Sequence, residues 1–475
     1  MMRATLVWFR QDLRVEDNAA LVAAARRGAP VIPVYIWSPG EQGDWAPGAA
    51  ARWWLHHSLG QLDASLRRLG SRLIIGRGRA LKVLRGLVRR TGADTIAWNR
   101  RYQPAAATRD AETRAGLERD GLAVKVFESA LLFDPADIRT RQGGPLRVFT
   151  PFWRACLAQP APAEPTSAPG RLASPSTWPE SLAVDELGLL PSHDWTEGLA
   201  AAWTPGELDA RAELNRFLDE GLASYELDRD RPSLMGTSRL SPYLCWGELG
   251  PRQVWHAVRE WAIDADDERI AHNAEVFLRE LGWREFSYHL LHHFPSTVQE
   301  PLRPEFACFP WRQDARALRA WQHGRTGYPL VDAGMRELWA TGWMHNRVRM
   351  VVASFLVKHL LLPWQQGACW FWDTLVDADL ANNTMGWQWS AGCGADAAPY
   401  FRIFNPVTQS ERYDPDGVYL RRWLPELDAL PGKAIHRPWE TGIRTYPKPV
   451  VDHAEARGRA LAAFRTMNRS SPGGA

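Results

Sequence analysis

The first 130 residues alternate short apolar runs with longer stretches of helical periodicity. Such alternation is typical of βαβ units that build a parallel sheet. No GxGxxG follows the first apolar run, which argues against a standard dinucleotide-binding turn. We therefore predict an α/β domain over residues 1–130, with strands at Thr5–Phe9, Val31–Trp37, Arg72–Gly76, Thr95–Trp98 and Val124–Phe127, and helices at 17–27, 49–69, 79–91 and 105–120.

The pattern changes beyond residue 130. Residues 157–182 are rich in Pro, Ala and Ser, which is typical of a linker or a surface crossover. From about residue 205 the apolar periodicity is helical and no convincing strand follows. We expect a connector over 131–204 and an all-helical domain over 205–475. The longest apolar stretch, Met350–Trp364, contains Lys358 and His359 and is too short to span a membrane, so it predicts a buried helix.

Composition narrows the class of protein. The 57 basic and 54 acidic residues give a net charge of +3, so a nucleic-acid site would have to be a local basic patch. The five cysteines are widely spaced and form no CxxC, which indicates neither a disulfide framework nor a metal site. With no signal peptide or membrane span in the sequence, we expect a cytoplasmic protein.

The segment 236–241 combines three hydroxyl side chains with Arg239 before Pro242. A turn that leads into a helix N-terminus with free N–H groups is suited to bind phosphate. The alternative is a helix cap built by Ser241. The residues alone leave both interpretations open.

Two other segments place polar groups beside aromatic ones. On a helix, Glu280, Trp283 and Arg284 share one face, although a surface Glu–Arg pair beside a half-buried tryptophan has the same pattern. The segment 342–350 predicts one helical stripe of Trp343, Asn346 and Met350, with Arg349 beside it needing a partner such as Asp377 or Asp379. A buried Arg–Asp pair is often only structural. Three further tryptophans, Trp311, Trp364 and Trp387, have the spacing of ordinary core residues.

Together, long segments of the chain resemble the photolyase/cryptochrome family. The similarity rests on LVWFRQDLRVEDNAAL near the N-terminus and on residues 324–347 and 396–427. Within the family the chain is most similar to bacterial class III cyclobutane pyrimidine dimer photolyases, which are close to plant cryptochromes. This resemblance implies a carbon–carbon lyase that repairs DNA in light, by electron transfer from photoexcited reduced FAD to a dimer flipped out of the helix.

The resemblance also implies roles for individual residues. The phosphates of FAD would be held by Tyr225, Thr237, Ser238, Arg239, Leu240 and Ser241, and the flavin and ribityl chain surrounded by Trp343, Asn346, Arg349, Asp377, Asp379 and Asn383. Asn383 would face flavin N5. Photoreduction of the flavin would run through Trp387, Trp364 and Trp311, with Trp387 nearest the cofactor.

The lesion site follows from the same motifs. Trp283 and Trp389 would flank the dimer, Glu280 would hydrogen-bond one thymine, and Met350 would offer an apolar contact beside Asn346. DNA phosphates around the pocket would be held by Arg229, Arg284, Arg347 and Arg402. We expect DNA containing pyrimidine dimers as the partner, no membrane contact, and a monomer.

The alternatives within the family differ at a few positions. Plant cryptochromes, which are blue-light receptors, usually carry Asp in place of Asn383, a non-aromatic residue in place of Trp283, and Val in place of Met350. They also have a long C-terminal extension, whereas this sequence ends about 50 residues after its RRWLPEL motif. A (6-4) photolyase would have a histidine pair at Asn346 and Met350, and the iron–sulfur branch needs clustered cysteines. A flavoprotein that binds DNA without repairing it remains a further alternative.

The resemblance favours 5,10-methenyltetrahydrofolate as a light-harvesting antenna near the N-terminal domain and the interdomain face. A deazaflavin or a second flavin are the alternatives. No motif identifies antenna-binding residues.

Overall fold

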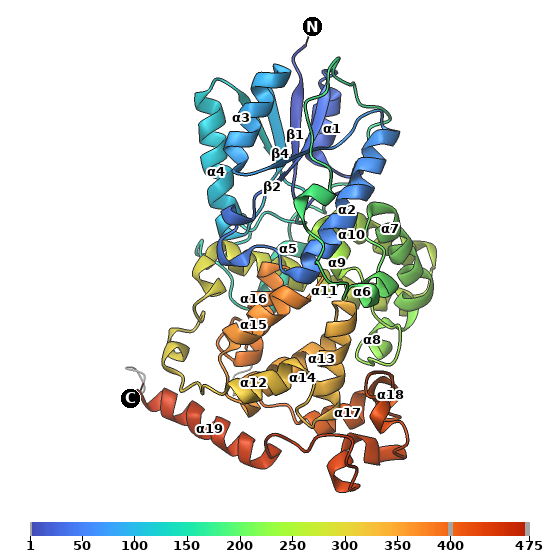
Figure 1. Ribbon diagram of the computed structural model, residues 1–475, viewed down its shortest axis with the longest axis vertical. Coiled ribbons are helices and arrows are strands. Elements are labelled where there is room, and N and C mark those ends of the chain that lie inside the picture. The colour runs from blue at the N-terminus through green and yellow to red at the C-terminus, as the bar shows by residue number, and fades with distance from the viewer. Residues whose placement is uncertain (1, 398–401, 471–475) are drawn as a thin grey trace.

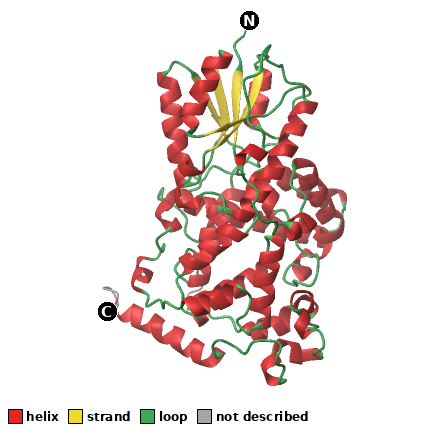
Figure 2. Ribbon diagram, viewed as in Figure 1, coloured by secondary structure: helices red, strands yellow, loops and turns green. Residues whose placement is uncertain are grey.

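The computed structural model describes residues 2–397 and 402–470, with side chains up to residue 468. A sheet with its helices forms one end of the molecule, and a larger helical region forms the other (Figure 1). Figure 2 shows that the strands are confined to the first of these regions. The predicted fold class, a parallel α/β domain followed by a helical domain, is confirmed.

The sheet has five parallel strands in the order β3-β2-β1-β4-β5. Its strands are β1 Thr5–Phe9, β2 Val31–Trp37, β3 Ile74–Arg77, β4 Thr95–Asn99 and β5 Ala123–Phe127. Side chains alternate between two apolar clusters: Leu6 and Trp8 face one, and Val7 and Phe9 face the other. Both faces are buried, as expected for a parallel sheet covered by helices.

Four helices connect these strands: α1 Ala19–Arg26, α2 Ala49–Arg68, α3 Ala80–Thr91 and α4 Pro104–Arg119. Local signals set their ends. Asn18 caps α1 through a hydrogen bond from the Leu21 N–H, and Gly92 ends α3 in the left-handed conformation at φ 65°. Pro104 starts α4 at a position where its missing N–H costs nothing.

The connector is tied to the α/β domain along its length. It contains α5 Phe149–Leu157 and α6 Glu197–Ala202, and between them an extended segment carries the buried Leu172. The Leu172 N–H donates to Leu69 O at 2.8 Å, and the Val31 N–H donates to Ala173 O at 2.8 Å. The proline-rich segment is therefore a surface crossover held by backbone hydrogen bonds.

The helical region is built from helices of very different length, and none of its described residues forms a strand. Its helices are α7 Glu207–Arg216, α8 Tyr225–Asp228, α9 Ser241–Trp246, α10 Pro251–Asp264, α11 Glu268–His293, α12 Ala315–Gln322, α13 Pro329–Thr341, α14 Asn346–Ser354, α15 Trp364–Thr374, α16 Leu380–Ala391, α17 Pro406–Tyr413, α18 Val418–Trp423 and α19 His453–Ser470. The apolar stretch after α14 continues as a buried π-helical turn, Phe355–His359. Among the helices described, none has the length and apolar character to cross a membrane.

The two regions share one apolar core. A single cluster runs from Val7 and Phe9 of the sheet, through α2, to Trp246 of the helical region. Between the regions, the buried Glu248 carboxylate accepts hydrogen bonds from Trp54 Nε1 at 3.0 Å and Ser58 Oγ at 2.5 Å. Burial raises the pKa of Glu248 to about 8. This shared core fixes the sheet against the helical region.

Candidate functional site

A cavity of about 600 Å³ lies in the helical region, between α9, α11, α14, α15 and α16. It has two parts. We call the buried side chains of Trp343, Asp377, Asp379 and Trp387 the inner wall, and the partly or fully exposed side chains of Arg229, Glu280, Trp283, Asn346, Arg347 and Trp389 the rim. All of the residues predicted to hold the cofactor line this cavity, and so do those predicted to contact the lesion.

One end of the cavity is formed by the segment 237–241, which leads into α9. Arg239 adopts a left-handed backbone at φ 53°, and its guanidinium lies 4.0 Å above the Trp203 ring and donates to Ala202 O at 3.2 Å. The Ser241 hydroxyl accepts from Trp343 Nε1 at 3.3 Å. No side chain caps α9, whose N-cap residue is Leu240, so the alternative of a cap built by Ser241 is wrong. The hydroxyl side chains of Thr237, Ser238 and Ser241 line the cavity beside Arg239, a set of donors suited to phosphate.

On the inner wall, Arg349 forms the expected ion pair with Asp377. Arg349 Nη2 donates to Asp377 Oδ2 at 2.8 Å, and its Nε donates to Met344 O at 2.7 Å. The other oxygen, Asp377 Oδ1, is buried and has no hydrogen-bond partner among the residues described. A buried acceptor without a partner is unfavourable unless a bound group donates to it. FAD has N–H and O–H donors, and the residues present therefore fit this cofactor.

The predicted stripe of Trp343, Asn346 and Met350 is wrong in one respect. Gly342, at φ 66°, ends α13, and α14 begins only at Asn346, so Trp343 lies in the turn between the two helices. His345 caps α14 by accepting the Arg347 N–H on Nδ1 at 3.2 Å. Burial lowers the pKa of His345 to about 4, which keeps this ring neutral.

Asp379 and Asn383 are held by the protein itself. One oxygen of Asp379 caps α16 and accepts from the Asn382 amide at 2.7 Å, and the other accepts from the Tyr288 hydroxyl. Asn383 donates from Nδ2 to Ala368 O at 3.1 Å. This bond leaves its amide oxygen free to accept from a ligand. Asn382, which the sequence did not single out, lines the cavity beside them.

At the rim, Trp283 stacks on Phe149 of the connector. The ring centroids are 3.7 Å apart and the planes differ by 9°. Phe149 is 2% exposed. One indole face is thus covered while Trp283 still lines the cavity. No signal in the sequence pointed to Phe149, because its partner lies far away in the chain.

Two of the predicted DNA-binding arginines are paired with carboxylates. Arg229 Nη1 lies 2.7 Å from Glu280 Oε1, and Arg347 Nη2 lies 2.6 Å from Asp230 Oδ2. Glu280 therefore pairs with Arg229, which directly follows α8, and not with Arg284 in the surface pair that the sequence left open.

Arg284 lines the cavity, but much of its side chain is engaged within the protein. Its side chain is only 12% exposed, donates to Ala130 O at 2.9 Å and lies 4.9 Å from the Tyr288 ring centroid. Its role as a DNA contact stays a prediction. Arg402 is exposed and lies outside the cavity lining, with its guanidinium 4.7 Å from the Phe404 ring.

The three tryptophans of the predicted photoreduction chain belong to one apolar cluster. Trp387 lines the cavity and packs so closely on Gly367, one turn after Trp364, that a Cβ there would lie 2.1 Å from its ring. Trp364 is 2% exposed, and Trp311 is a partly exposed member at the edge. The sequence missed Trp321, which is fully buried with its ring centroid 6.1 Å from that of Trp387.

Comparisons with known proteins agree with this site. The family model described as "DNA photolyase" matches residues 5–170, and "FAD binding domain of DNA photolyase" matches residues 277–466. The chain therefore belongs to the photolyase/cryptochrome family, and its helical region contains the FAD-binding domain. It is 48% identical to a deoxyribodipyrimidine photo-lyase of Agrobacterium fabrum over 98% of both chains, and 41% identical to cryptochrome-2 of Arabidopsis thaliana over 96% of this chain and 78% of that one. A bacterial class III photolyase structure from Agrobacterium tumefaciens superimposes with a TM-score of 0.94 at 47% identity, covering 99% of this chain and 98% of the other.

Proposed function

We propose that this protein is a deoxyribodipyrimidine photo-lyase that uses light to split cyclobutane pyrimidine dimers in DNA. The observation that carries the proposal is the single cavity in which an inner wall suited to a flavin is continuous with a rim suited to a flipped-out dinucleotide. When bound, FAD supplies the light-driven electron that opens the cyclobutane ring and is then returned. The side chains of this chain bind and orient the cofactor and the lesion.

At the rim, Trp283 and Trp389 offer aromatic faces to the two bases of the dimer. Phe149 keeps the Trp283 ring in one orientation. Glu280, held by Arg229, is placed to hydrogen-bond a thymine and to stabilise charge that develops on it. Met350 adds an apolar contact. These residues bind and orient the lesion, which must leave the duplex because its bonds cannot be reached inside the stack.

On the inner wall, the Arg349–Asp377 pair and Asn383 orient the flavin ring system. The free amide oxygen of Asn383 suits a protonated ring nitrogen, which favours retention of the reduced cofactor. Trp387 and the cluster behind it give a route for electrons from the surface to the inner wall. The chain can thereby restore the reduced cofactor in light.

The second candidate is a cryptochrome-like blue-light receptor, favoured by the 41% identity with a plant cryptochrome. Trp283, Met350 and Asn383 argue against it, because all three line the cavity and differ from the residues usual in plant cryptochromes. We therefore place repair first.

The experiment is repair of a thymine-dimer oligonucleotide by the purified, chemically reduced holoprotein, in blue light and in darkness. Restoration of thymine absorbance only in light supports the proposal. No repair by a sample that demonstrably contains reduced FAD would favour the receptor.

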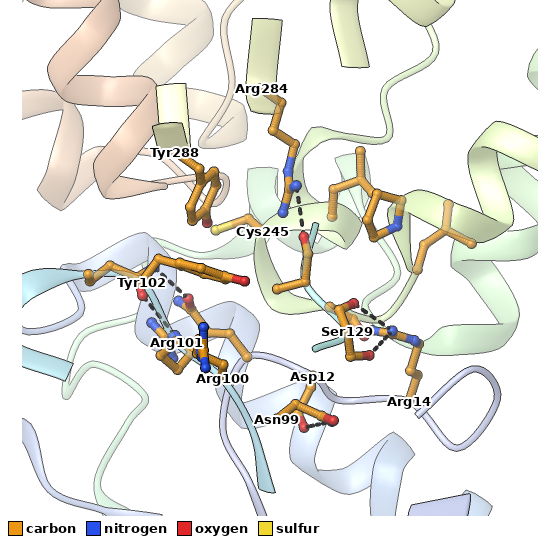
Figure 3. A pocket seen from close by; sticks show the side chains of 17 residues that line it. Asp12, Arg14, Asn99, Arg100, Arg101, Tyr102, Ser129, Cys245, Arg284 and Tyr288 are labelled. Atoms are coloured by element: carbon orange, nitrogen blue, oxygen red, sulfur yellow. Dashed lines mark hydrogen bonds between the residues drawn. The ribbon is translucent and has the colours of Figure 1, made fainter. Parts of the chain in front are cut away.

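We also propose 5,10-methenyltetrahydrofolate as antenna. The interdomain cavity, lined by Arg14, Arg101 and Tyr102 near the carboxyl ends of β1 and β4, is the expected place for a ligand in such a sheet (Figure 3). However, its volume is only about 20 Å³, which is room for about one water molecule.

A stack of tryptophans at the surface is the alternative place for a planar pterin. Trp339 is 58% exposed and stacks between Trp195 at 6.3 Å and Trp370 at 6.1 Å. Trp370 lies on α15, whose Phe371 lines the flavin cavity, so this stack is one helix away from the cofactor. We expect Trp339→Ala to lower the folate content while the FAD content is unchanged; an unchanged folate content would place the antenna elsewhere.

A further inference from the structure

Arg347 lies at the first turn of α14 and its charged fork is occupied within the protein. Nη2 lies 2.6 Å from Asp230 Oδ2, Nη1 lies 3.7 Å from Met350 Sδ, and the guanidinium lies 4.7 Å from the Tyr413 ring centroid. Arg347 is therefore held by contacts on three sides and does not extend freely into solvent.

Asp230 is the exchangeable member of this arrangement. Its side chain is 31% exposed, against 17% for Arg347, so the carboxylate is the more solvent-accessible partner of the pair. A carboxylate and a phosphate ester compete for the same planar fork of arginine. A phosphate can replace the carboxylate in such a partly exposed ion pair, because ion pairs in contact with solvent contribute little to stability.

We propose that Asp230 is a specificity-determining residue for DNA. Its carboxylate occupies Arg347 in place of a backbone phosphate, so that this part of the rim presents a neutral pair to intact DNA. Arg347 is transferred to the backbone only when a flipped-out dinucleotide brings its phosphate to the rim. This inference rests on the proposed function, because it takes Arg347 as a contact for the DNA strand that carries the lesion.

The test is the salt dependence of DNA binding by Asp230→Asn holoprotein, measured in the dark with intact and dimer-containing duplexes. The variant should gain one phosphate contact with intact DNA. Its slope of log K against log salt should then steepen by about 0.9, so that between 50 and 200 mM salt its affinity for intact DNA falls about 3.5-fold more than that of the wild type. The slope for dimer DNA, which already uses Arg347, should change little, and discrimination between the two DNAs should fall.

Two matched variants isolate the pair. Glu226→Gln removes the same charge four positions earlier, where Glu226 pairs with the exposed His272 at 3.0 Å outside the cavity lining. It should leave both slopes unchanged. In an Arg347→Ala background, Asp230→Asn should have no further effect on intact DNA, as expected for two residues that act through one contact.

Three results would overturn the inference. Weaker binding of both DNAs by Asp230→Asn would mean that Asp230 only positions Arg347. An equal change in Glu226→Gln would mean that net charge alone matters. An unchanged slope would mean that Arg347 never meets the phosphate of intact DNA. None of these results depends on catalysis, so failure of light-dependent repair in the wild type would count separately against the proposed function.

Discussion

Two arginines of α14 form ion pairs of similar length at different depths of one cavity. Arg349, 24% exposed, lies 2.8 Å from Asp377, which is 3% exposed, and Arg347, 17% exposed, lies 2.6 Å from Asp230, which is 31% exposed. The two pairs thus differ in the burial of the carboxylate and not of the arginine. Breaking a buried pair leaves a charge without solvent, whereas an exposed pair contributes only about 0–1 kcal/mol. The same two side-chain types therefore make a fixed support for a cofactor at the inner wall and an exchangeable contact at the rim. The burial of the carboxylate, and not the length of the ion pair, distinguishes the two roles.

The largest expected effect comes from Arg349→Ala. This change leaves the Asp377 carboxylate buried and unpaired, so the free energy of unfolding should fall by about 3–5 kcal/mol and FAD should be lost during purification. Urea denaturation and the flavin content measure the two effects. Arg336→Ala breaks a pair with Glu426 outside the cavity, in which both partners are partly exposed, and should cost about 1 kcal/mol. Equal losses in the two variants would remove the distinction between buried and exposed pairs.

Trp387→Phe tests whether the inner wall also passes electrons. Photoreduction of oxidised FAD should stop, while chemically reduced protein still repairs dimers and binds them as before, because the rim is unchanged. Flavin absorbance under blue light measures photoreduction, and a repair assay with chemically reduced protein measures dimer splitting. Trp321→Phe, which changes a neighbour of Trp387, is the matched control and should reduce normally. Normal photoreduction in Trp387→Phe would point to another donor.

His345 supports both ion pairs, because it caps α14, the helix that carries Arg347 and Arg349. The folded-state pKa of His345 is about 4, below the unfolded value of about 6.5. The neutral ring therefore makes its full contribution to the free energy of unfolding above pH 6.5 and loses it as the pH falls toward 4. At pH 5 the loss is about 2 kcal/mol by this linkage. His345→Asn keeps a capping acceptor without the titration. Between pH 7 and 5 the wild type should therefore lose about 2 kcal/mol more than the variant in urea denaturation, and parallel losses would contradict the assignment.

The smallest expected effect is that of Phe149→Leu at the rim. The variant keeps an apolar side chain behind Trp283 but loses the stacked ring, which is worth about 1 kcal/mol. Binding of dimer DNA in the dark should weaken about fivefold, with the FAD content unchanged because the inner wall is not touched. Fluorescence anisotropy of a labelled duplex measures the affinity. An affinity equal to that of the wild type would mean that Trp283 needs no support.

The sequence predicted the α/β region well because buried strands and amphipathic helices leave a strong periodic pattern. Strands β1 and β2 match their predicted bounds, whereas β3 begins two residues later than predicted. Arg72, predicted to start this strand, packs its guanidinium 4.9 Å from the Trp178 ring centroid. The turn at Gly342 was missed for a similar local reason: helical periodicity continues through 342–350 even though the backbone does not.

The site was less open to prediction from pattern alone. The Phe149–Trp283 stack and the Arg229–Glu280 and Arg347–Asp230 pairs join residues from distant parts of the chain, and no local periodicity records such contacts. The roles of individual residues came with the family resemblance, and the structure adds which of them share a cavity. It also shows that Arg284, which lines the cavity, donates to Ala130 O and lies over the Tyr288 ring.

The central claim is that cofactor and lesion occupy two halves of one cavity. A crystal structure of the holoprotein with a thymine-dimer duplex tests it most directly. We predict the dimer outside the helix stack between Trp283 and Trp389, FAD against the inner wall, and Arg347 on a backbone phosphate instead of Asp230. A dimer that stays stacked in the duplex, or that binds away from this cavity, would contradict the account.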